Sequence, residues 1–536
     1  SGFLGDLEAM DAISGYSSPT ECPEYDNFEV GHTSTSVSLA TGLQKARDIK
    51  GTNENIIVVI GDGSLSGGEA FEGLDEASEL GTGIIIVVND NEMSIGENVG
   101  FISKFLKKVI SSGKYQNFRE DVKSFINRIK ADRVKRTLER LERSIKGYVT
   151  PFYALESLGF RFFSVSEGNN IEKLLPMLRK VKGLKGPIIL LVKTEKGKGY
   201  CFAEENKEKF HGIAPFNIET GNTYKSSVSY SEIFGNKILD LAREDTEIYA
   251  LSAAMIKGTG LDKFSKEFPD RCIDTGIAEG FAVTFSAGLA RSQKKPYVCI
   301  YSTFIQRAIS QLIHDISIQN LPVRFIIDRS GIVGEDGKTH NGIYDLSFFL
   351  TIQNFTVLCP TTAKELEEAL ELSKDFNSGP LVIRIPRDSV FNIEDDKPLE
   401  IGRWKEIKKG SKNLFIATGT MLKIILEIHE ELKNRGIDAT IVSAASVKPL
   451  DENYLLNYIK EYDNIFVLEE NYVKNSFATS ILEFLNDNGI NKLIHRIALD
   501  SAIIPHGERD ELLTEERLKG ESLIERIEEF VYGRKK

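Results

Sequence analysis

The sequence predicts an α/β protein of three domains, with mainly parallel sheets flanked by helices. A chain of 536 residues is longer than a domain with a single hydrophobic core usually is. Short apolar, β-branched runs alternate with segments whose apolar residues recur every three or four positions, which indicates strands that alternate with amphipathic helices. This alternation is typical of parallel sheets whose strands are joined by helical crossovers.

The clearest strand–helix–strand unit spans residues 56–95. Ile56–Ile60 and Ile84–Val88 have the length and composition of buried strands. Between them, Gly67–Leu80 is rich in Glu, Ala and Leu, with apolar residues at helical spacing. A crossover of this kind leaves its two strands parallel in one sheet.

Two oxygen-bearing side chains follow these strands: Asp62 comes after the first and Asn91 after the second. In an open α/β sheet both positions face the crevice where ligands bind, so a carboxylate and an amide oxygen meet there and suit Mg²⁺. Gly61 and Gly63 let the backbone approach a phosphate closely. Each fragment alone is often only a turn or loop, but the pair joined by one helix favours a metal–phosphate site.

A helix is expected to begin shortly before this unit. Gly31 and His32 precede Thr33 and a run of further Ser and Thr residues, which are typical at helix N-termini. The first turn of a helix is a natural site for an anion. The alternative is an ordinary capped helix beside a polar histidine.

The segments GDGSLSGGEAFEGL and NDNEMSIGENVG resemble the 1-deoxy-D-xylulose-5-phosphate synthase family, whose members are relatives of transketolase. The similarity covers nearly the whole chain, including KGKGY at residues 196–200. It implies a transketolase-like thiamine-diphosphate-binding fold followed by a transketolase C-terminal domain. The implied domains are a diphosphate-binding domain at 1–225 with a basic helical excursion at 101–147, a pyrimidine-binding domain at 226–396, and the C-terminal domain at 397–536.

The resemblance implies thiamine diphosphate and Mg²⁺ as cofactors. It adds Met93 to Asp62 and Asn91 as a metal ligand. Glu279 aligns with the carboxyl group beside the aminopyrimidine ring, where burial raises a carboxyl pKa toward the range that proton transfer needs. A glutamate at a helix N-terminus is otherwise commonly a dipole partner. The implied cofactor contacts are Gly31, His32, Thr33, Gly63, Ser64, Asn91, Tyr200 and Glu279.

Side chains in the second predicted domain also follow apolar runs. Arg329 and Arg384 come after two such runs, and two guanidinium groups at neighbouring strand ends suit a phosphate. A single arginine there is more often part of a surface ion pair. The resemblance implies that glyceraldehyde 3-phosphate is bound by these arginines with Arg387 as a further candidate, and that His340 is a catalytic proton carrier. The implied substrate contacts are Tyr301, Arg329, Asp336, His340 and Arg384.

The implied reaction joins pyruvate to D-glyceraldehyde 3-phosphate, with loss of CO₂, through an enamine on the cofactor, and gives 1-deoxy-D-xylulose 5-phosphate. Two alternatives are a transketolase-type ketol transferase and a catalytically silent relative with the same fold. Two motifs depart from the family pattern. Gly280-Phe281 stands where the family has Gln/Glu-His, and Ser166–Asn169 replaces its Asp-Gly-His.

Composition argues against two classes of partner, nucleic acids and membranes, and the resemblance implies small-molecule substrates. The net charge of −12 disfavours broad nucleic-acid binding, and no run of about 18 apolar residues exists to span a membrane. The beginning of the sequence lacks the features of a signal peptide. Five dispersed cysteines fit a reducing cytoplasm. The resemblance implies a homodimer.

Overall fold

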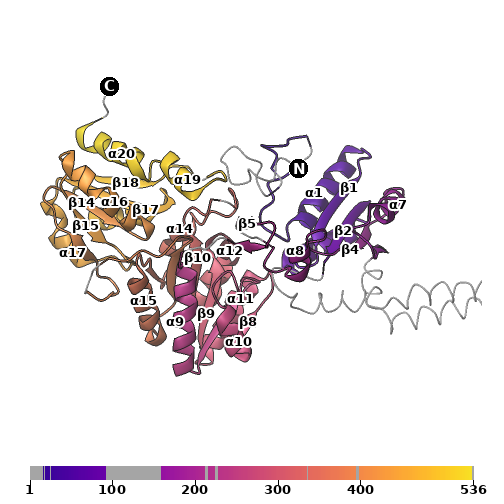
Figure 1. Ribbon diagram of the computed structural model, residues 1–536, viewed down its shortest axis with the longest axis horizontal. Helices are drawn as coiled ribbons and strands as arrows, with labels where there is room; N and C mark the ends of the chain where they lie inside the picture. The colour runs from indigo at the N-terminus through magenta and orange to yellow at the C-terminus, as the bar shows by residue number, and fades with distance from the viewer. Residues whose placement is uncertain are drawn as a thin grey trace, which may run out of the picture. The chain divides into compact units, whose positions relative to one another are not determined.

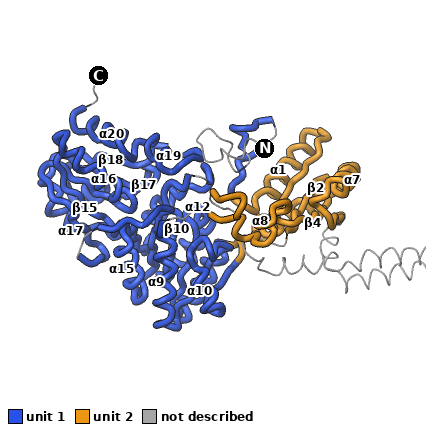
Figure 2. The backbone as a smooth tube through the Cα atoms, in the orientation of Figure 1, with its two compact units in different colours: residues 1–31, 226–275, 279–536 blue, residues 32–225, 276–278 orange. Residues whose placement is uncertain are grey.

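The chain folds into two compact units, coloured separately in Figure 2. Unit 2 comprises His32–Lys225 and Gly276–Ala278, and unit 1 comprises Ser1–Gly31, Ser226–Thr275 and Glu279–Lys536. Met93 and the predicted excursion at 101–147 lie outside the described residues. The computed structural model describes residues 16, 18–24, 26–81, 83–91, 159–211, 215–223, 227–334, 336–393, 397–501 and 503–533.

Unit 2 is built on a four-stranded sheet in the order β1-β2-β4-β3, with every pairing parallel. The strands are β1 (Ile56–Gly61), β2 (Ile84–Asp90), β3 (Arg161–Val165) and β4 (Ile188–Lys193). Helix α2 (Gly68–Leu80) connects β1 to β2, so the predicted strand–helix–strand unit is confirmed. The pairing of Gly61 with Asn89 places the carboxyl ends of both strands at one edge of the sheet.

Strand β1 is less buried than its sequence predicts. Ile57 and Val59 are 51% and 65% exposed, whereas Val58 and Ile60 are buried. The cause is position: among the described residues β1 lies at the edge of the sheet, while β2 lies between β1 and β4 and is buried on both faces. The prediction of two buried strands is therefore right for β2 and wrong for one face of β1.

Helices α1 and α2 pack together on this sheet. Gly73 of α2 makes the approach possible, because a Cβ atom there would lie 2.8 Å from the backbone nitrogen of Ser38 in α1. Val37 and Leu74 join the same core. The other elements of unit 2 are η1 (Ser64–Ser66), α7 (Ile171–Lys182), α8 (Cys201–Glu205) and a hairpin of β5 (Phe216–Asn217) and β6 (Asn222–Thr223), with α1 spanning Ser36–Lys50.

Unit 1 contains a seven-stranded sheet in the order β16-β11-β12-β10-β9-β7-β8. All its pairings are parallel except that of β16 with β11. The strands are β7 (Ile248–Ser252), β8 (Cys272–Asp274), β9 (Lys295–Tyr301), β10 (Arg324–Ser330), β11 (Thr356–Leu358), β12 (Leu381–Pro386) and β16 (Ser446–Lys448). Because β16 comes from the predicted C-terminal domain, that segment and the preceding one share a sheet.

A five-stranded sheet, β13-β15-β14-β17-β18, completes unit 1 at the orange and yellow end of the chain (Figure 1). Its strands are β13 (Lys405–Lys408), β14 (Asn413–Ala417), β15 (Ala439–Ser443), β17 (Asn464–Tyr472) and β18 (Ile494–Leu499). The main helices of unit 1 are α9 (Tyr230–Glu244), α10 (Asp262–Glu267), α11 (Glu279–Arg291), α14 (Asp345–Thr351), α15 (Ala363–Asp375), α16 (Thr420–Asn434), α17 (Glu452–Asn457), α18 (Phe477–Asp487), α19 (Arg509–Glu515) and α20 (Gly520–Tyr532). Shorter helical turns are α12 (Ser302–Ile305), α13 (Ile309–Gln311), η2 (Pro269–Arg271), η3 (Gln306–Ala308), η4 (Leu312–Ser317) and η5 (Ile459–Glu461).

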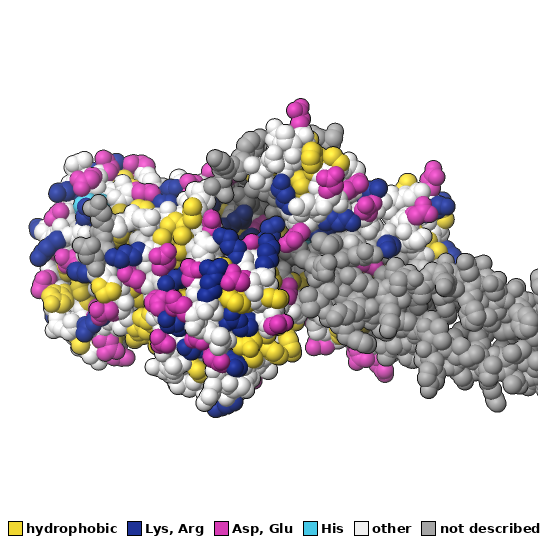
Figure 3. All heavy atoms as spheres, turned by 60° about the horizontal axis from the view of Figure 1, so that its bottom comes forward, with side chains coloured by type: hydrophobic (Ala, Val, Ile, Leu, Met, Phe, Trp, Pro, Cys, Tyr) yellow, Lys and Arg dark blue, Asp and Glu magenta, His cyan; other side chains and the backbone are white. Residues whose placement is uncertain are grey.

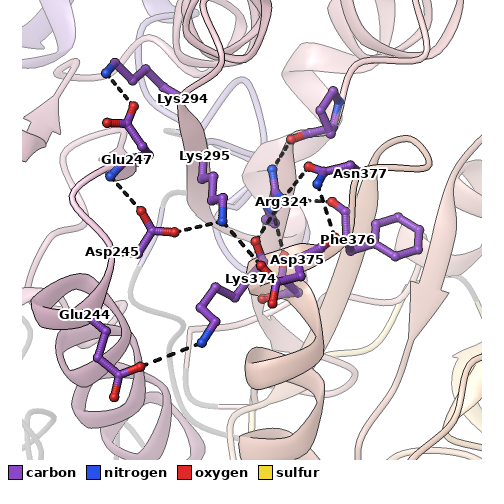
Figure 4. A network of polar contacts seen from close by, with 12 residues as sticks. Glu244, Asp245, Glu247, Lys294, Lys295, Arg324, Lys374, Asp375, Phe376 and Asn377 are labelled. Carbon is purple, nitrogen blue, oxygen red and sulfur yellow. Dashed lines mark hydrogen bonds and ion pairs between the residues drawn. The ribbon is translucent and has the colours of Figure 1, made fainter.

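A buried arginine fixes the start of β10, the strand that carries Arg329. Arg324 is 1% exposed, and its guanidinium group donates to the carbonyl oxygens of Ser373 at 3.0 Å and Phe376 at 2.8 Å (Figure 4). These carbonyls belong to the C-terminal end of α15, where helix carbonyls lack partners within the helix. Beside it, Lys295 at the start of β9 pairs with Asp245 at 2.7 Å. Both contacts anchor the central strands of this sheet.

Basic and acidic side chains are interspersed over the larger body visible in Figure 3. Within the ranges that the structure describes, no helix has both the length and the apolarity needed to cross a membrane.

Candidate active site

In unit 2, Asp62 and Asn91 follow two adjacent parallel strands at the same edge of the sheet. The backbone N–H of Asp62 donates to the carbonyl of Asn89 at 3.1 Å, which continues the pairing of β1 with β2 one residue further. Asp62 is 5% exposed. A buried carboxylate and an amide at neighbouring strand ends form a donor set that fits Mg²⁺, which prefers oxygen ligands and keeps room for phosphate oxygens.

The N-termini of α1 and α2 lie together beside Asp62. Ser34 donates from its hydroxyl to the carbonyl of Ser64 at 2.7 Å, and a Cβ atom at Gly67 would lie 2.3 Å from that hydroxyl. Neither N-cap residue, Thr35 of α1 or Gly67 of α2, accepts a side-chain hydrogen bond from its helix. Two helix N-termini side by side present N–H groups and partial positive charge, which fits a diphosphate.

Several of the predicted cofactor contacts in unit 2 therefore lie close to one another. Gly63 and Ser64 form the turn between Asp62 and α2. His32 and Thr33 form the turn before α1, whose first residues contact that segment through Ser34. The sequence prediction of a helix start at this position is confirmed.

Sequence reasoning assigned no role to a lysine–histidine pair in the loop after β4. Lys196 Nζ lies 2.6 Å from His211 Nδ1. Burial lowers the pKa of Lys196, although the charge of Asp62 acts in the opposite direction. Burial and the charge of Lys196 also lower the pKa of His211. The loop therefore brings a cation into the field of Asp62, and the Lys- and Gly-rich sequence KGKGY was the available signal.

Tyr200, a predicted cofactor contact, packs among aromatic rings at the start of α8. Its ring centroid lies 5.5 Å from those of Phe202 and Phe210 and 5.9 Å from that of Phe216. Its hydroxyl donates to the carbonyl of Ile218 at 2.7 Å. The phenol oxygen is therefore engaged in holding the hairpin that follows.

In unit 1, Arg329 and Arg387 converge on one carboxylate oxygen. Arg329 Nη1 lies 2.9 Å and Arg387 Nη1 lies 3.3 Å from Oδ2 of Asp336. The guanidinium carbon of Arg329 also lies 4.1 Å from the ring centroid of Tyr301, a cation–π contact. Two guanidinium groups that share one anionic oxygen have the spacing to grip a phosphate.

Next to this pair lies a cavity of about 450 Å³. Its lining contains the two arginines and two further cations, Lys257 and Lys263. Four carboxyl groups also line the cavity, those of Glu232, Asp262, Asp328 and Asp388, so its wall carries both signs of charge. The volume suits a small molecule, and the part of the wall formed by Arg329 and Arg387 suits its phosphate group.

The backbone of β10 is bent where it presents Arg329. Its pairing with β12 shifts register between Ile327 and Ser330, and Arg329 has a positive φ of 56°. Asp328 supports this conformation, because its Oδ1 accepts the backbone N–H of Arg329 at 2.7 Å and its Oδ2 accepts the hydroxyl of Ser231 at 2.7 Å. A bulge of this kind re-aims a side chain out of the regular strand pattern.

His340 is linked to the same cluster through Phe304, whose ring centroid lies 5.9 Å from that of Tyr301. Its Nδ1 is 2.9 Å from the hydroxyl oxygen of Thr339, and its ring meets the edge of Phe304 with a centroid distance of 5.4 Å. The side chain is 8% exposed. The predicted group of Tyr301, Arg329, Asp336 and His340 therefore lies on neighbouring segments of unit 1.

The structure does not bring Arg384 into this group. Arg384 lies within β12 rather than beyond its end, and its buried side chain contacts α14 and β17. Its guanidinium group donates to Asp345 at 2.8 Å and to the carbonyl of Glu470 at 3.0 Å. Arg387, one residue past the end of β12, occupies the position beside Arg329 instead.

Glu279 is the first residue of α11 and is 5% exposed. Burial raises the pKa of its carboxyl group, while a hydrogen bond from its own backbone N–H and the charge of Arg307, 3.8 Å away, act against the rise. A carboxyl group with a raised pKa keeps its proton to a higher pH than an exposed glutamic acid does, and it can exchange that proton with a base. Phe281, two residues after Glu279 and part of the departure from the family pattern, is 57% exposed.

Solved structures share this architecture. A split-gene transketolase described as an inactive β4 tetramer matches with a TM-score of 0.52 and 25% identity, over 58% of this chain and 100% of that chain. The transketolase of Campylobacter jejuni subsp. jejuni matches with a TM-score of 0.50 and 17% identity, over 94% of this chain and 81% of that one, which shows a common fold. The predicted fold class is confirmed.

Families match all three parts of the chain. Residues 226–391 match the transketolase pyrimidine-binding domain and residues 402–523 match the transketolase C-terminal domain. With the carboxylate–amide pair at the strand ends, these matches define a transketolase-like enzyme that uses thiamine diphosphate and Mg²⁺. Residues 3–194 match the family described as 1-deoxy-D-xylulose-5-phosphate synthase.

Curated relatives specify the family. The chain is 80% identical to 1-deoxy-D-xylulose-5-phosphate synthase of Fusobacterium nucleatum subsp. nucleatum over 531 residues. These residues make up 99% of this chain and 88% of the relative. It is 42% identical over 530 residues to the synthase of Natranaerobius thermophilus, over 97% of this chain and 84% of that relative. The chain belongs to the 1-deoxy-D-xylulose-5-phosphate synthase family.

Proposed function

We propose that this chain condenses pyruvate with D-glyceraldehyde 3-phosphate, with loss of CO₂, to form 1-deoxy-D-xylulose 5-phosphate, a precursor for isoprenoid synthesis. The observation that carries the proposal is the convergence of Arg329 and Arg387 on Asp336, beside His340, in a member of this family. A phosphorylated aldehyde requires cations at one end and a proton donor at the other. This cluster provides both.

Asp62 and Asn91 are the residues that would hold Mg²⁺, and the adjoining N-termini of α1 and α2 would hold the diphosphate of the cofactor. When bound, thiamine diphosphate supplies a carbon nucleophile and stores the electron pair released with CO₂. The predicted third ligand, Met93, lies outside the described residues. Lys196, in the field of Asp62, adds positive charge on the side of the diphosphate.

Glu279 moves the proton that activation of the cofactor requires. Its buried carboxyl group, with a raised pKa, is suited to exchange a proton with a pyrimidine ring nitrogen. Arg307 lies within 3.8 Å and limits the rise in pKa, so the carboxyl group can also ionise. The role needs both protonation states near neutral pH.

At the acceptor end, Arg329 and Arg387 bind the phosphate, and the ring of Tyr301 supports the guanidinium group of Arg329. Asp336 keeps the two cations together before substrate binds. His340 donates a proton to the aldehyde oxygen as the new carbon–carbon bond forms.

The proposal is tested with purified protein, thiamine diphosphate and Mg²⁺. Release of labelled CO₂ from pyruvate is expected to be strongly stimulated by D-glyceraldehyde 3-phosphate, with formation of a five-carbon product detected by mass spectrometry. Turnover only with a ketose phosphate as donor would instead identify a ketol transferase. No heat of binding for thiamine diphosphate in the presence of Mg²⁺ would identify a silent relative.

We also propose that the chain forms a homodimer and acts in the cytoplasm. Phe281 and Phe285 on α11 and Ile318 after η4 are 57%, 37% and 67% exposed, and the two aromatic rings are 5.6 Å apart. Exposed apolar side chains on two contacting elements favour a protein interface. The five cysteines are free, which fits a reducing compartment. Sedimentation equilibrium of the wild-type protein and of Phe281→Asp tests the dimer.

A further inference from the structure

Tyr16 lies on the imidazole ring of His340, although 324 positions separate the two residues in the sequence. The two ring centroids are 4.9 Å apart and the ring planes differ by 16°, which is a stacked arrangement. The phenol oxygen of Tyr16 lies 3.4 Å from Nε2 of His340. A segment near the beginning of the chain therefore contacts the proposed proton donor directly.

This contact belongs to a larger attachment. Lys338, two residues before His340, is a common partner for the segment that follows Tyr16. Its Nζ lies 2.7 Å from the carboxylate of Glu29, 2.9 Å from the hydroxyl of Thr20 and 3.3 Å from the hydroxyl of Ser18. Ser18 in turn donates to Glu29 at 2.8 Å and is 1% exposed. Charged and neutral hydrogen bonds thus tie the segment to the loop that carries His340.

Three groups together define the orientation of the imidazole ring. Thr339 contacts Nδ1 at 2.9 Å, Phe304 meets the ring edge-on, and Tyr16 covers one ring face and approaches Nε2. The partner at one ring nitrogen of a histidine selects which nitrogen carries the proton. Thr339 therefore acts on Nδ1, whereas the hydroxyl of Tyr16, 3.4 Å from Nε2, makes only a long contact.

Tyr16 is also within the electric field of the phosphate-binding cluster. Burial raises the pKa of its hydroxyl group, the charge of Asp336 raises it further, and the charge of Arg329 opposes the rise. The neutral phenol is therefore the stable form at neutral pH. Tyr16 is 38% exposed, whereas His340, on which its ring is stacked, is 8% exposed.

From this geometry we infer that Tyr16 is a positioning residue of the acceptor site, which holds His340 against the aldehyde end of a short phosphorylated acceptor and shields it from water. The inference rests on the function proposed above. The positioning role is assigned to the aromatic ring of Tyr16 rather than to its hydroxyl group, because stacking on the imidazole and covering it need only the aromatic face. The attachment through Lys338 holds the ring in place.

Replacement of Tyr16 tests the inference through the separate Michaelis constants of the two substrates. For Tyr16→Ala, the KM for D-glyceraldehyde 3-phosphate is expected to rise about tenfold, and for Tyr16→Phe it is expected to stay within about threefold. The KM for pyruvate and the affinity for thiamine diphosphate are expected to stay unchanged in both. Tyr458→Ala, a replacement of an exposed tyrosine at the end of α17, is the matched control.

Binding of glycerol 3-phosphate, measured by calorimetry, provides a readout that does not require turnover. Tyr16→Ala is expected to weaken it severalfold, and Tyr16→Phe is expected to restore it. Equal binding by the wild type and Tyr16→Ala would overturn the inference, and so would an equal rise in both KM values with a lower melting temperature, which indicates a structural role. If the wild type bound glycerol 3-phosphate but did not use pyruvate, the proposed function would be wrong. The comparison of glycerol 3-phosphate binding by the wild type and Tyr16→Ala would still decide the role of Tyr16.

Discussion

Arg384 and Asp345 form a buried ion pair in unit 1, with Nε of the arginine 2.8 Å from Oδ2 of the aspartate and side-chain exposures of 6% and 1%. Asp345 also accepts the hydroxyl of Ser330 at 3.0 Å. Arg384 thereby connects β12 with α14 and with the carbonyl of Glu470 in β17, while Asp345 connects α14 with β10. The pair is a structural junction of unit 1, whereas Arg387 is the arginine that accompanies Arg329.

Arg384 and Arg387 are expected to respond differently to replacement by alanine. Arg384→Ala leaves Asp345 buried without its cation and is expected to cost about 3–5 kcal/mol of stability. Arg387→Ala, at a partly exposed position, is expected to cost about 1 kcal/mol or less and to raise the KM for D-glyceraldehyde 3-phosphate at least about tenfold. Thermal unfolding and steady-state kinetics separate the two. A larger KM effect at Arg384 in a stable variant would contradict this assignment.

Asp62→Ala is expected to reduce the affinity for thiamine diphosphate with Mg²⁺ by more than about a hundredfold, because the ligand that we propose for the metal is lost. The fold should persist, since Asp62 follows β1 and contributes no side chain to the core. Titration calorimetry and circular dichroism measure the two effects. Asp75→Ala, on the exposed face of α2 in the same unit, is the control and should bind normally. Normal cofactor affinity in Asp62→Ala would place the metal elsewhere.

Glu279→Gln keeps the size and burial of the side chain but removes its exchangeable carboxyl proton. We expect kcat to fall by about 10²–10⁴, the usual contribution of general acid–base catalysis, with cofactor affinity changed little. Exchange of the thiazolium C2 proton for deuterium, followed by NMR in the loaded protein, should slow in parallel. Unchanged exchange would exclude Glu279 from cofactor activation.

The stability of unit 1 is expected to depend on pH through Asp328. Burial raises the pKa of this carboxyl group from 3.8 to about 6, against the hydrogen bond from Ser231 and the charge of Arg329. The folded state thus binds the proton more tightly than the unfolded chain does. The associated stabilisation is present below pH 3.8 and is lost as the pH rises to about 6, a loss of about 3 kcal/mol.

The variant Asp328→Asn cannot ionise, so this part of the pH dependence should disappear from its unfolding. Denaturant unfolding at pH values between 4 and 7 measures the free energy of both proteins. The difference between wild type and variant should change by about 2 kcal/mol over this range in favour of the variant at higher pH, because part of the stabilisation is already lost at pH 4. A constant difference would show that Asp328 has an ordinary pKa.

Replacement of Gly258 is expected to weaken acceptor binding, because this glycine packs against Tyr301. A Cβ atom at Gly258 would lie 1.8 Å from the phenol oxygen of Tyr301, so alanine must displace the ring on which Arg329 rests. Gly258→Ala should therefore raise the KM for D-glyceraldehyde 3-phosphate about five- to tenfold by disturbing that cation–π contact. Gly288→Ala in α11, where a Cβ atom meets nothing within 4 Å, is the control. It should keep normal kinetics and gain up to about 1 kcal/mol of stability.

Local sequence patterns were sufficient for several elements of the site. The edge that carries Asp62 and Asn91 followed from two apolar runs and one short helix, because a right-handed crossover leaves few arrangements for adjacent strands. The start of α1 followed from its Ser and Thr residues. Glu279 at the start of α11 followed from its position before a helical pattern.

Other features depend on contacts between distant residues. Arg384 and Arg387 lie in one short segment, and only the point at which β12 ends decides which of them leaves the sheet. The exposure of Ile57 and Val59 depends on which strand occupies the edge. Strand β16 pairs with β11, about ninety residues earlier in the sequence, and no local pattern encodes that partner.

The sequence by itself determined the α/β class, the placement of Asp62 and Asn91 at one edge of the first sheet, and the family, because strand and helix periods and short turns are encoded locally. Only the tertiary structure decided that Arg387 rather than Arg384 joins Arg329, that Lys196 meets His211, and that Tyr16 covers His340. The physical reason is that each of these pairings depends on where strands end and on which distant segments pack together.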